Sequence, residues 1–572
     1  MKHLLLYFKK YRWESILAPL FKMLEAGFDL MVPLVVAGII DVGIANRDTR
    51  QILIRVGVLL LMAILGLLCS FTAQYFAAKA AVGTATGLRR SLLQKIQSLP
   101  VPDLERQGSA KLITRMVSDV NQVQNGVNMF LRLFLRSPFI VFGALVLAFS
   151  IHKGISLVFL GVIAVLFVIV FGIMALTKPL YRQQNQQLEG VAGATREELN
   201  GVRVIRAFGT EKQQQERFEK NNQRLQAIQE HAGKIASYMN PLTYVVINAG
   251  LIGILWLGGM EVHVGALQTG EVMALVNYAS QILVELVKLA NLLVLLGKAM
   301  VSMDRVGQML DAEATVCFAG DRTGAEADTI LSLEQVGLRY PGAGDDSLSG
   351  VSVTLKAGQT LGIIGGTGSG KTTLVNLISR MYPATEGQIL LKGEPINQWS
   401  QTALRRTVAV AEQKATLFSG TIRSNLLFGN ESADDEALWR ALEIAQAAEF
   451  VREKKLGLDD PVEQGGRNLS GGQKQRLTIA RALVADPDIL ILDDSASALD
   501  YATERNLRQA LKELNKTLVI VSQRTASISH ADQILVLEDG QLVGSGTHTE
   551  LLDSCPAYGE IHGLQFPQEG AL

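Results

Sequence analysis

The sequence predicts two domains of different fold classes, an α-helical domain of six transmembrane helices followed by an α/β domain. Six long apolar segments fill the first half of the chain, and in the second half short strands rich in Val, Ile and Leu alternate with helical stretches around a Gly-rich turn. A chain of 572 residues is also too long for one domain by the usual length rule. We expect the membrane domain over residues 1–312, a linker over 313–328 and the α/β domain over 329–572.

Each of the six apolar segments is long enough to cross a membrane, because about 20 residues of α-helix span roughly 30 Å of hydrocarbon. The segments cover residues 14–40, 52–78, 127–151, 154–177, 236–262 and 270–300. Before them, residues 3–13 mix Leu, Tyr and Phe with Lys and Arg, which indicates an amphipathic helix lying on a membrane surface or, alternatively, a solvated helix.

The connections between these segments predict how they are oriented. Those at residues 79–126 and 178–235 are long and carry most of the Lys and Arg, whereas the other three are short. Because Lys- and Arg-rich loops stay in the cytoplasm, we expect both termini and the α/β domain there, in a multi-pass protein of the cytoplasmic (inner) membrane. The long connections predict two helical hairpins whose tips, near 106–111 and 204–212, either contact a soluble domain or are solvated.

Some charged residues lie within the membrane segments, where charges are costly and usually face a cavity or a partner. Lys22, Glu25 and Asp29 share one helical face in the first segment, and Glu285 and Lys288 are three residues apart in the sixth. Two interpretations stay open: these residues neutralise one another against a neighbouring helix, or they line a substrate cavity.

In the second half, the Gly-rich turn Gly365–Thr372 fits the phosphate-binding pattern G-x-x-x-x-G-K-[ST] between a strand and a helix. Its glycines let successive N–H groups face one centre, and the following helix directs its positive end there. Lys371 would reach the β- and γ-phosphates, and the Thr372 hydroxyl would bind Mg²⁺. The alternative is an ordinary Gly-rich turn. The predicted nucleotide-binding residues are Gly366, Thr367, Gly368, Ser369, Gly370, Lys371, Thr372 and Thr373.

A second strand ends in a carboxylate that complements this loop. Ile489–Leu492 is apolar and leads into Asp493, the kind of acid that holds Mg²⁺ against phosphates. The formal net charge is zero, which gives no electrostatic argument for nucleic acid as a partner. Three scattered cysteines do not form a disulfide framework. The phosphate loop and Asp493 together predict ATP and Mg²⁺ as the ligands. The predicted strands of this domain are 362–364, 408–410, 489–492, 518–522 and 534–537.

The pentapeptide Leu469-Ser470-Gly471-Gly472-Gln473 resembles the signature motif of ATP-binding cassette (ABC) proteins. Six membrane segments followed by one such cassette resemble, over essentially the whole chain, an ABC exporter half-transporter of the type IV fold. The resemblance implies that two cassettes close head to tail, so that Ser470, Gly471, Gly472 and Gln473 contact ATP held by a second chain. A Ser-Gly-Gly run before a helix is a suitable anion site for that purpose.

The same resemblance assigns further positions. It implies that Tyr340 stacks on adenine, and that Gln413 is the Q-loop glutamine, which joins Thr372 and Asp493 at Mg²⁺. Residues 497–500 match the D-loop, and 544–548 match a C-terminal motif of the family. The hairpin tips become coupling helices that dock on cassettes, one of them on the cassette of the partner.

Two positions depart from the family pattern in ways that affect the chemistry. Asp494 stands where the family has the Glu that polarises water, and a carboxylate withdrawn by one methylene loses reach as a general base. Gln523 stands where the family has the switch His, and glutamine can donate a hydrogen bond but cannot carry positive charge. A smaller departure lies at 462–466, which reads Val-Glu-Gln-Gly-Gly.

Both departures fall in the nucleotide site of this chain, while its signature, which serves the other site, is intact. This combination resembles the degenerate-site subunit of heterodimeric bacterial multidrug ABC exporters. It implies ATP-driven export of small lipophilic compounds across a lipid bilayer, with Asp494, Gln523 and Gln413 as the catalytic positions of a slow site. It also implies a second half-transporter subunit with the consensus Glu and His and an altered signature. A lipid or peptide exporter, or a homodimeric exporter, is the alternative.

Overall fold

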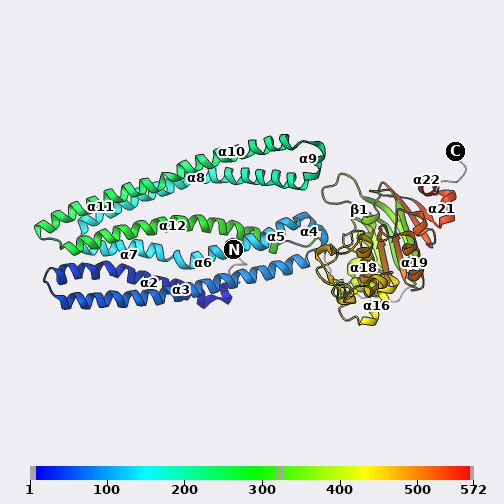
Figure 1. Cartoon of the computed structure of the whole chain (residues 1–572), viewed down its shortest axis with the longest axis horizontal. Helices are drawn as coiled ribbons and strands as arrows, with labels where there is room; N and C mark the ends of the chain where they lie inside the picture. The colour runs from blue at the N-terminus through cyan, green and yellow to red at the C-terminus, as the bar shows by residue number, and fades with distance from the viewer. Residues whose placement is uncertain (1–7, 317–319, 321–327, 567–572) are drawn as a thin grey trace. The chain divides into compact units, whose positions relative to one another are not determined.

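The computed structural model describes residues 8–316, 320 and 328–566 (Figure 1). Two of the predicted features lie partly outside these residues. Of the amphipathic segment 3–13, residues 8–10 are helical and Trp13 already belongs to the first long helix, whereas residues 3–7 are outside the described part. Most of the predicted linker 313–328 is also outside it.

The chain divides into two compact units. One comprises residues 1–98 and 109–312, and the other comprises residues 99–108 and 313–572. The second unit is thus discontinuous, because it includes a short segment from within the predicted membrane domain.

Long helices build the first unit, which confirms the predicted six-helix membrane domain. Within the described residues, six helical stretches have the length and composition to cross a membrane: Arg12–Ile44, Thr49–Ser98, Ser109–Ile151, Lys153–Asn200, Glu211–Val264 and Thr269–Leu310. Their elements are α2 (Arg12–Gly38) with a π-helical continuation to Ile44, α3 (Thr49–Ser98), α5 (Ser109–Thr114), α6 (Val120–Leu133), α7 (Arg136–Ile151), α8 (Lys153–Asn200), α9 (Val202–Phe208), α10 (Glu211–Ser237), α11 (Met239–Val264) and α12 (Thr269–Leu310). With 50 residues, α3 extends about 75 Å at 1.5 Å per residue, well beyond the thickness of a bilayer.

Helix packing in this unit uses small side chains. The α3 helix runs beside α2 (Figure 1), and Ala73, Ala77, Ala80 and Ala81 of α3 are fully buried. Small residues let two helices approach closely where lipid offers no hydrophobic driving force between them. The α12 helix packs against α2, α6, α7 and α11, so it occupies the centre of the unit.

The two predicted hairpin tips are short helices with different surroundings. Helix α4 (Val101–Gln107) belongs to the second unit, where Val101 packs against the cassette core and the Tyr382 hydroxyl donates a short hydrogen bond to the Glu105 carboxylate. Helix α9 belongs to the first unit and exposes its apolar side chains, with Phe208 78% exposed.

A ten-stranded sheet in the order β5-β4-β1-β2-β12-β11-β3-β10-β9-β6 forms the centre of the described second unit. Its strands are β1 (Thr329–Leu338), β2 (Leu348–Lys356), β3 (Thr360–Gly365), β4 (Glu386–Leu391), β5 (Glu394–Pro395), β6 (Val408–Ala411), β9 (Ile489–Asp493), β10 (Thr517–Val521), β11 (Gln533–Glu538) and β12 (Gln541–Gly546), while β7 (Gly420–Thr421) pairs with β8 (Pro461–Val462). The helices are α13 (Lys371–Ile378), α14 (Gln401–Thr407), α15 (Ile422–Leu426), α16 (Asp435–Ile444), α17 (Ala448–Arg452), α18 (Gly471–Val484), α19 (Tyr501–Lys512), α20 (Thr525–Ile528), α21 (His548–Ser554) and α22 (Pro556–Gln565). This confirms the α/β fold class.

The five strands predicted from sequence are the five that run parallel to one another, β11, β3, β10, β9 and β6. Their central residues are mainly apolar, as expected for a parallel sheet that helices cover on both faces. In the register, Val521 of β10 lies opposite both Ile363 of β3 and Asp493 of β9. The carboxyl ends of these three strands therefore meet at one edge, where ligands of α/β sheets bind.

Candidate functional site

The phosphate loop lies at that edge, between β3 and α13. Gly370, the last residue before the helix, has φ 98°, a left-handed conformation that favours glycine, and a Cβ there would lie 3.0 Å from Ser347 O. The Lys371 side chain folds back over the loop and donates to Gly365 O at 3.0 Å and Gly366 O at 2.6 Å. Burial lowers the pKa of Lys371, and the nearby carboxylates of Asp494 and Asp493 oppose that shift. The ammonium thus lies within the loop that a phosphate chain would fill.

Next to the loop, Thr372 and Asp493 form a pair suited to a divalent cation. The Thr372 side chain lies close enough to the Asp493 carboxylate to lower its pKa, and Asp493 is only 5% exposed. Burial raises the pKa of Asp493, and the nearby Thr372 and Lys371 side chains oppose that shift only in part. The part of the chain that the structure describes holds no group of three or more His, Cys, Asp or Glu able to bind a metal. A cation at this pair would therefore take its remaining ligands from phosphate, water and neutral side chains.

Asp494 follows directly and occupies a strained backbone position. Its φ is 45°, and its N–H donates to Val521 O at 3.0 Å, which fixes the residue against the end of β10. Its side chain accepts a hydrogen bond from Gln413 Nε2 at 3.3 Å, so the structure brings two of the predicted catalytic positions together. Burial raises the pKa of the Asp494 carboxyl, and the hydrogen bond from Gln413 partly offsets that effect.

Gln523, the third predicted catalytic position, follows β10 at the same edge. Its side chain is exposed, while its backbone oxygen accepts a hydrogen bond from Gln565 Nε2 at 2.7 Å. The neighbouring Arg524 bonds Glu504 of α19 at 3.0 Å and lies over the Tyr501 ring. Backbone contacts and the Arg524 side chain therefore hold this segment, and the Gln523 side chain points away from the protein interior.

The predicted adenine contact, Tyr340, lies at the end of β1 and is half-buried. Its hydroxyl is 3.3 Å from Thr373 Oγ1, which links it to the first turn of α13. Its ring meets the Tyr382 ring edge to face at 5.0 Å. These contacts keep the ring beside the phosphate loop, and stacking on a base stays a prediction.

The signature begins α18. Ser470 is its N-cap and forms a capping box with Gln473, in which Gln473 N donates to Ser470 Oγ at 3.3 Å and Ser470 N donates to Gln473 Oε1 at 3.0 Å. Ser470 and Gly471 are exposed. Across the described residues, no hydrogen bond joins 470–473 to the phosphate loop, so the exposed end of α18 is available to a second chain.

A loop between Asp494 and α19 connects the two motifs. Ser497 Oγ donates to Asp494 O at 2.8 Å, and Ala498 N donates to Gln475 Oε1 of α18 at 3.0 Å. The loop ends at Asp500, the N-cap of α19, where hydrogen bonds from Thr503 lower the pKa of the Asp500 carboxyl. These hydrogen bonds link the segment after Asp494 to the signature helix of the same chain.

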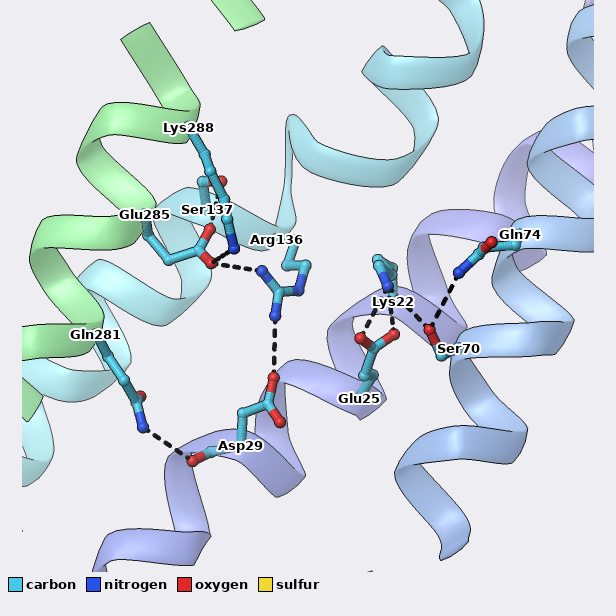
Figure 2. Close-up of polar contacts among 10 residues, drawn as sticks. All are labelled: Lys22, Glu25, Asp29, Ser70, Gln74, Arg136, Ser137, Gln281, Glu285 and Lys288. Atoms are coloured by element: carbon cyan, nitrogen blue, oxygen red, sulfur yellow. Dashed lines mark hydrogen bonds and ion pairs between the residues drawn. The ribbon is translucent and has the colours of Figure 1, made fainter. Parts of the chain in front are cut away.

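In the membrane unit, the charged residues predicted from sequence pair with one another and with Arg136 (Figure 2). Lys22 bonds Glu25 at 2.8 Å and Ser70 of α3 at 3.2 Å. Arg136, at the start of α7, bonds Asp29 of α2 at 2.9 Å and also bonds Glu285 of α12. Lys288 bonds Glu285 at 2.9 Å. The six charges cancel in three pairs of opposite sign, which agrees with the neutralisation interpretation.

Beside this network, an apolar groove of about 920 Å³ lies between α2 and α7. Its lining includes Met23, Phe28, Phe139 and Phe142, and carries no charged side chain. Such a surface suits a lipophilic molecule rather than an ionic one.

Sequence reasoning missed two residues of these sites, Arg136 and Gln565. The partners of Arg136 are 107 and 149 residues away, and Gln565 is 42 residues from Gln523. An Arg inside the predicted apolar segment 127–151 was a signal for the first, because charges within a membrane need partners. No local pattern marked the second.

Comparison with known proteins covers nearly the whole chain. Residues 15–286 match the family described as "ABC transporter transmembrane region", and residues 348–497 match that described as "ABC transporter". The chain is 34% identical to the uncharacterized ABC transporter ATP-binding protein YfiB of Bacillus subtilis (strain 168), over 100% of both chains. It is 29% identical to the ATP-dependent lipid A-core flippase of Albidiferax ferrireducens (strain ATCC BAA-621 / DSM 15236 / T118), over 98% of this chain and 97% of the flippase.

Among solved structures, the chain is similar to a bacterial Atm1-family ABC exporter with ATP bound. The TM-score is 0.83 at 20% identity, over 98% of this chain and 99% of the exporter chain. At that identity the likeness establishes a shared fold.

Proposed function

The chain belongs to the ABC transporter family, and from that premise we propose that it is one half of a heterodimeric bacterial exporter of lipophilic compounds. ATP hydrolysis coupled to transport is the activity of such a chain, which combines a membrane region with an ATP-binding cassette. The six membrane-capable helices make it a multi-pass membrane protein. Its cassette and both termini would face the cytoplasm.

One observation carries the heterodimer proposal: Asp494 and Gln523 replace the consensus Glu and His beside an intact signature. The Asp494 carboxylate bonds Gln413 and sits on a strained backbone, so its short side chain has little freedom to reach farther out. A general base must lie within hydrogen-bond distance of the water it activates. This chain's own nucleotide site would therefore bind ATP and hydrolyse it slowly.

The intact signature would complete the second site. Exposed Ser470 and Gly471 would contact the γ-phosphate of ATP on the partner, whose own Glu and His would drive hydrolysis. Thr372, Asp493 and Gln413 would hold Mg²⁺ in this chain's site, where the cation would neutralise phosphate charge. Lys371 would bind the phosphate chain after giving up its bonds to the loop carbonyls.

Transport would follow from closure of the two cassettes. ATP at both interfaces would close them, the helical hairpins would transmit that movement, and an inward-open cavity would turn outward. Helix α4 is held to this chain's cassette by Tyr382 and Glu105, while the exposed apolar face of α9, with Phe208, would dock on the partner's cassette. Hydrolysis at the consensus site would reset the cycle.

The cargo class rests on the chemistry of the membrane unit. The groove between α2 and α7 is apolar, and the charged residues beside it are paired with one another, so a small lipophilic compound suits it best. A lipid is the second candidate, because one relative is named a lipid A-core flippase.

Purified chain assayed with and without a candidate partner tests the heterodimer. We expect low ATPase activity from the chain alone and full activity from the mixture. In the mixture, Asp494→Asn should slow turnover less than the equivalent change of the partner's Glu. Brisk hydrolysis by this chain alone would overturn the proposal. Stimulation of the reconstituted pair by lipophilic drugs, by lipids or by peptides would then identify the cargo class.

A further inference from the structure

The last described helix, α22, ends beside the segment that carries Gln523. The amide of Gln565, its final residue, spans Arg524: Nε2 donates to Gln523 O at 2.7 Å, and Oε1 accepts from Thr525 N at 2.8 Å. One side chain thus binds the backbone on both sides of the same residue. The two bonds need opposite ends of the amide, so a reversed amide would face oxygen with oxygen and N–H with N–H.

A second set of contacts holds Gln565 and Thr525 together. Thr525 is fully buried, and its hydroxyl donates to Gln565 Oε1 at 3.1 Å. His562, one turn earlier on α22, places Nδ1 3.0 Å from the same hydroxyl. These bonds form a continuous chain from His562 through Thr525 and Gln565 to the Gln523 carbonyl, and such chains reinforce their members.

Helix α22 is itself anchored near the phosphate loop. Tyr558 is fully buried in a cluster that includes Ile364, the residue of β3 just before Gly365, and its hydroxyl is 2.7 Å from His548 Nδ1. The same cluster contains Ile528 at the end of α20. The helix is therefore a rigid support joined to both the phosphate loop strand and the Gln523 segment.

We propose that Gln565 is a positioning residue for nucleotide recognition: it fixes the backbone on both sides of Arg524 so that the Gln523 side chain meets the γ-phosphate of ATP in this chain's site. The inference rests on the proposed role of Gln523. Glu504 holds the Arg524 side chain independently, so Gln565 sets the backbone while Glu504 sets the side chain. A preorganised contact costs less to form on binding than one that must first be ordered.

Affinity for ATP relative to ADP tests this, because only ATP has the γ-phosphate. The full chain in lipid nanodiscs would be titrated with the non-hydrolysable analogue AMP-PNP and with ADP, both with Mg²⁺. Gln565→Ala should weaken AMP-PNP binding roughly two- to tenfold, the value of about one hydrogen bond, and leave ADP binding unchanged. Gln565→Glu keeps the acceptor for Thr525 but places a carboxylate oxygen against the Gln523 carbonyl oxygen, so its loss of AMP-PNP affinity should be at least as large as that of Gln565→Ala.

Leu564→Ala is the matched control, since Leu564 precedes Gln565 on α22 and is 79% exposed. This variant should change neither the AMP-PNP affinity nor the ADP affinity. If both Gln565 variants weaken AMP-PNP and ADP binding equally, they merely loosen the cassette. If AMP-PNP binding is unchanged, the hydrogen bonds of Gln565 do not position Gln523 for the γ-phosphate. Either result overturns the inference.

Gln523→Ala, measured alongside, separates this inference from its premise. If Gln523→Ala lowers AMP-PNP affinity and the Gln565 variants do not, only the positioning role fails. If Gln523→Ala has no effect, the role of Gln523 fails and the inference fails with it. If Gln523 and Gln565 act through one contact, the double variant Gln523→Ala with Gln565→Ala should lose no more AMP-PNP affinity than Gln523→Ala alone.

Discussion

Placing the consensus Glu and His at positions 494 and 523 should give this chain's own nucleotide site fast hydrolysis. In the double variant Asp494→Glu with Gln523→His, one added methylene moves the carboxylate outward by about 1.5 Å, the length of a C–C bond. That is a large gain for a group whose oxygen now lies 3.3 Å from Gln413 Nε2 and whose backbone is fixed by a bond to Val521. A positioned general base contributes about 10²- to 10⁴-fold. We therefore expect a rise of roughly a hundredfold over the slow wild-type rate.

The assay measures phosphate release from ATP and Mg²⁺ by this chain alone, in nanodiscs shown to hold two copies. Every site then carries the same Asp494 and Gln523 beside an intact signature. Lys371→Ala gives the background rate. Asp486→Glu is the matched control, because Asp486 also has a positive φ, 46°, and lies in the loop before β9 rather than in the nucleotide site.

The double variant should also be slightly less stable than the wild type, because Asp tolerates the left-handed backbone at position 494, with φ 45°, better than Glu does. A wild-type chain that already hydrolyses ATP rapidly, or a double variant within twofold of the wild type, would refute the argument from side-chain reach.

Three further predictions concern other parts of the molecule. Arg136→Met leaves the Glu285 carboxylate, 3% exposed, without its shortest ion pair, and should destabilise the membrane unit by about 3 kcal/mol in thermal melts in detergent. Adding Glu285→Met should recover most of that loss. Burial and the nearby His562 lower the pKa of His548, so the folded cassette binds fewer protons than the unfolded chain. The melting temperature of the cassette should therefore fall as the pH drops below about 6.5, and His548→Gln should flatten that dependence. Tyr382→Phe removes the hydrogen bond to the α4 carboxylate while keeping the ring, and should reduce drug-stimulated ATPase activity more than basal activity.

The sequence predicted the features that local patterns encode. Apolar runs identified the membrane helices and all five parallel strands, and glycine spacing identified the phosphate loop. The antiparallel strands β1, β2 and β4 were not predicted, because exposed residues interrupt their apolar runs. In the sites, Gln413 and Asp494 were each identified from recognised motifs, and the structure added the contact between them. The roles of Arg136 and Gln565 depend on partners far away in the chain, which no local spacing reveals.

The discontinuous second unit has a consequence for biosynthesis. Residues 99–108 leave the ribosome about 200 residues before residue 313, where the rest of that unit starts. At 5–20 residues per second, helix α4 waits roughly 10 to 40 s for its binding surface to begin to appear. During this interval the apolar Val101 of α4 has no docking partner within the nascent cassette. A cassette expressed from residue 313 onward would lack this piece and expose the surface around Tyr382 that α4 normally covers.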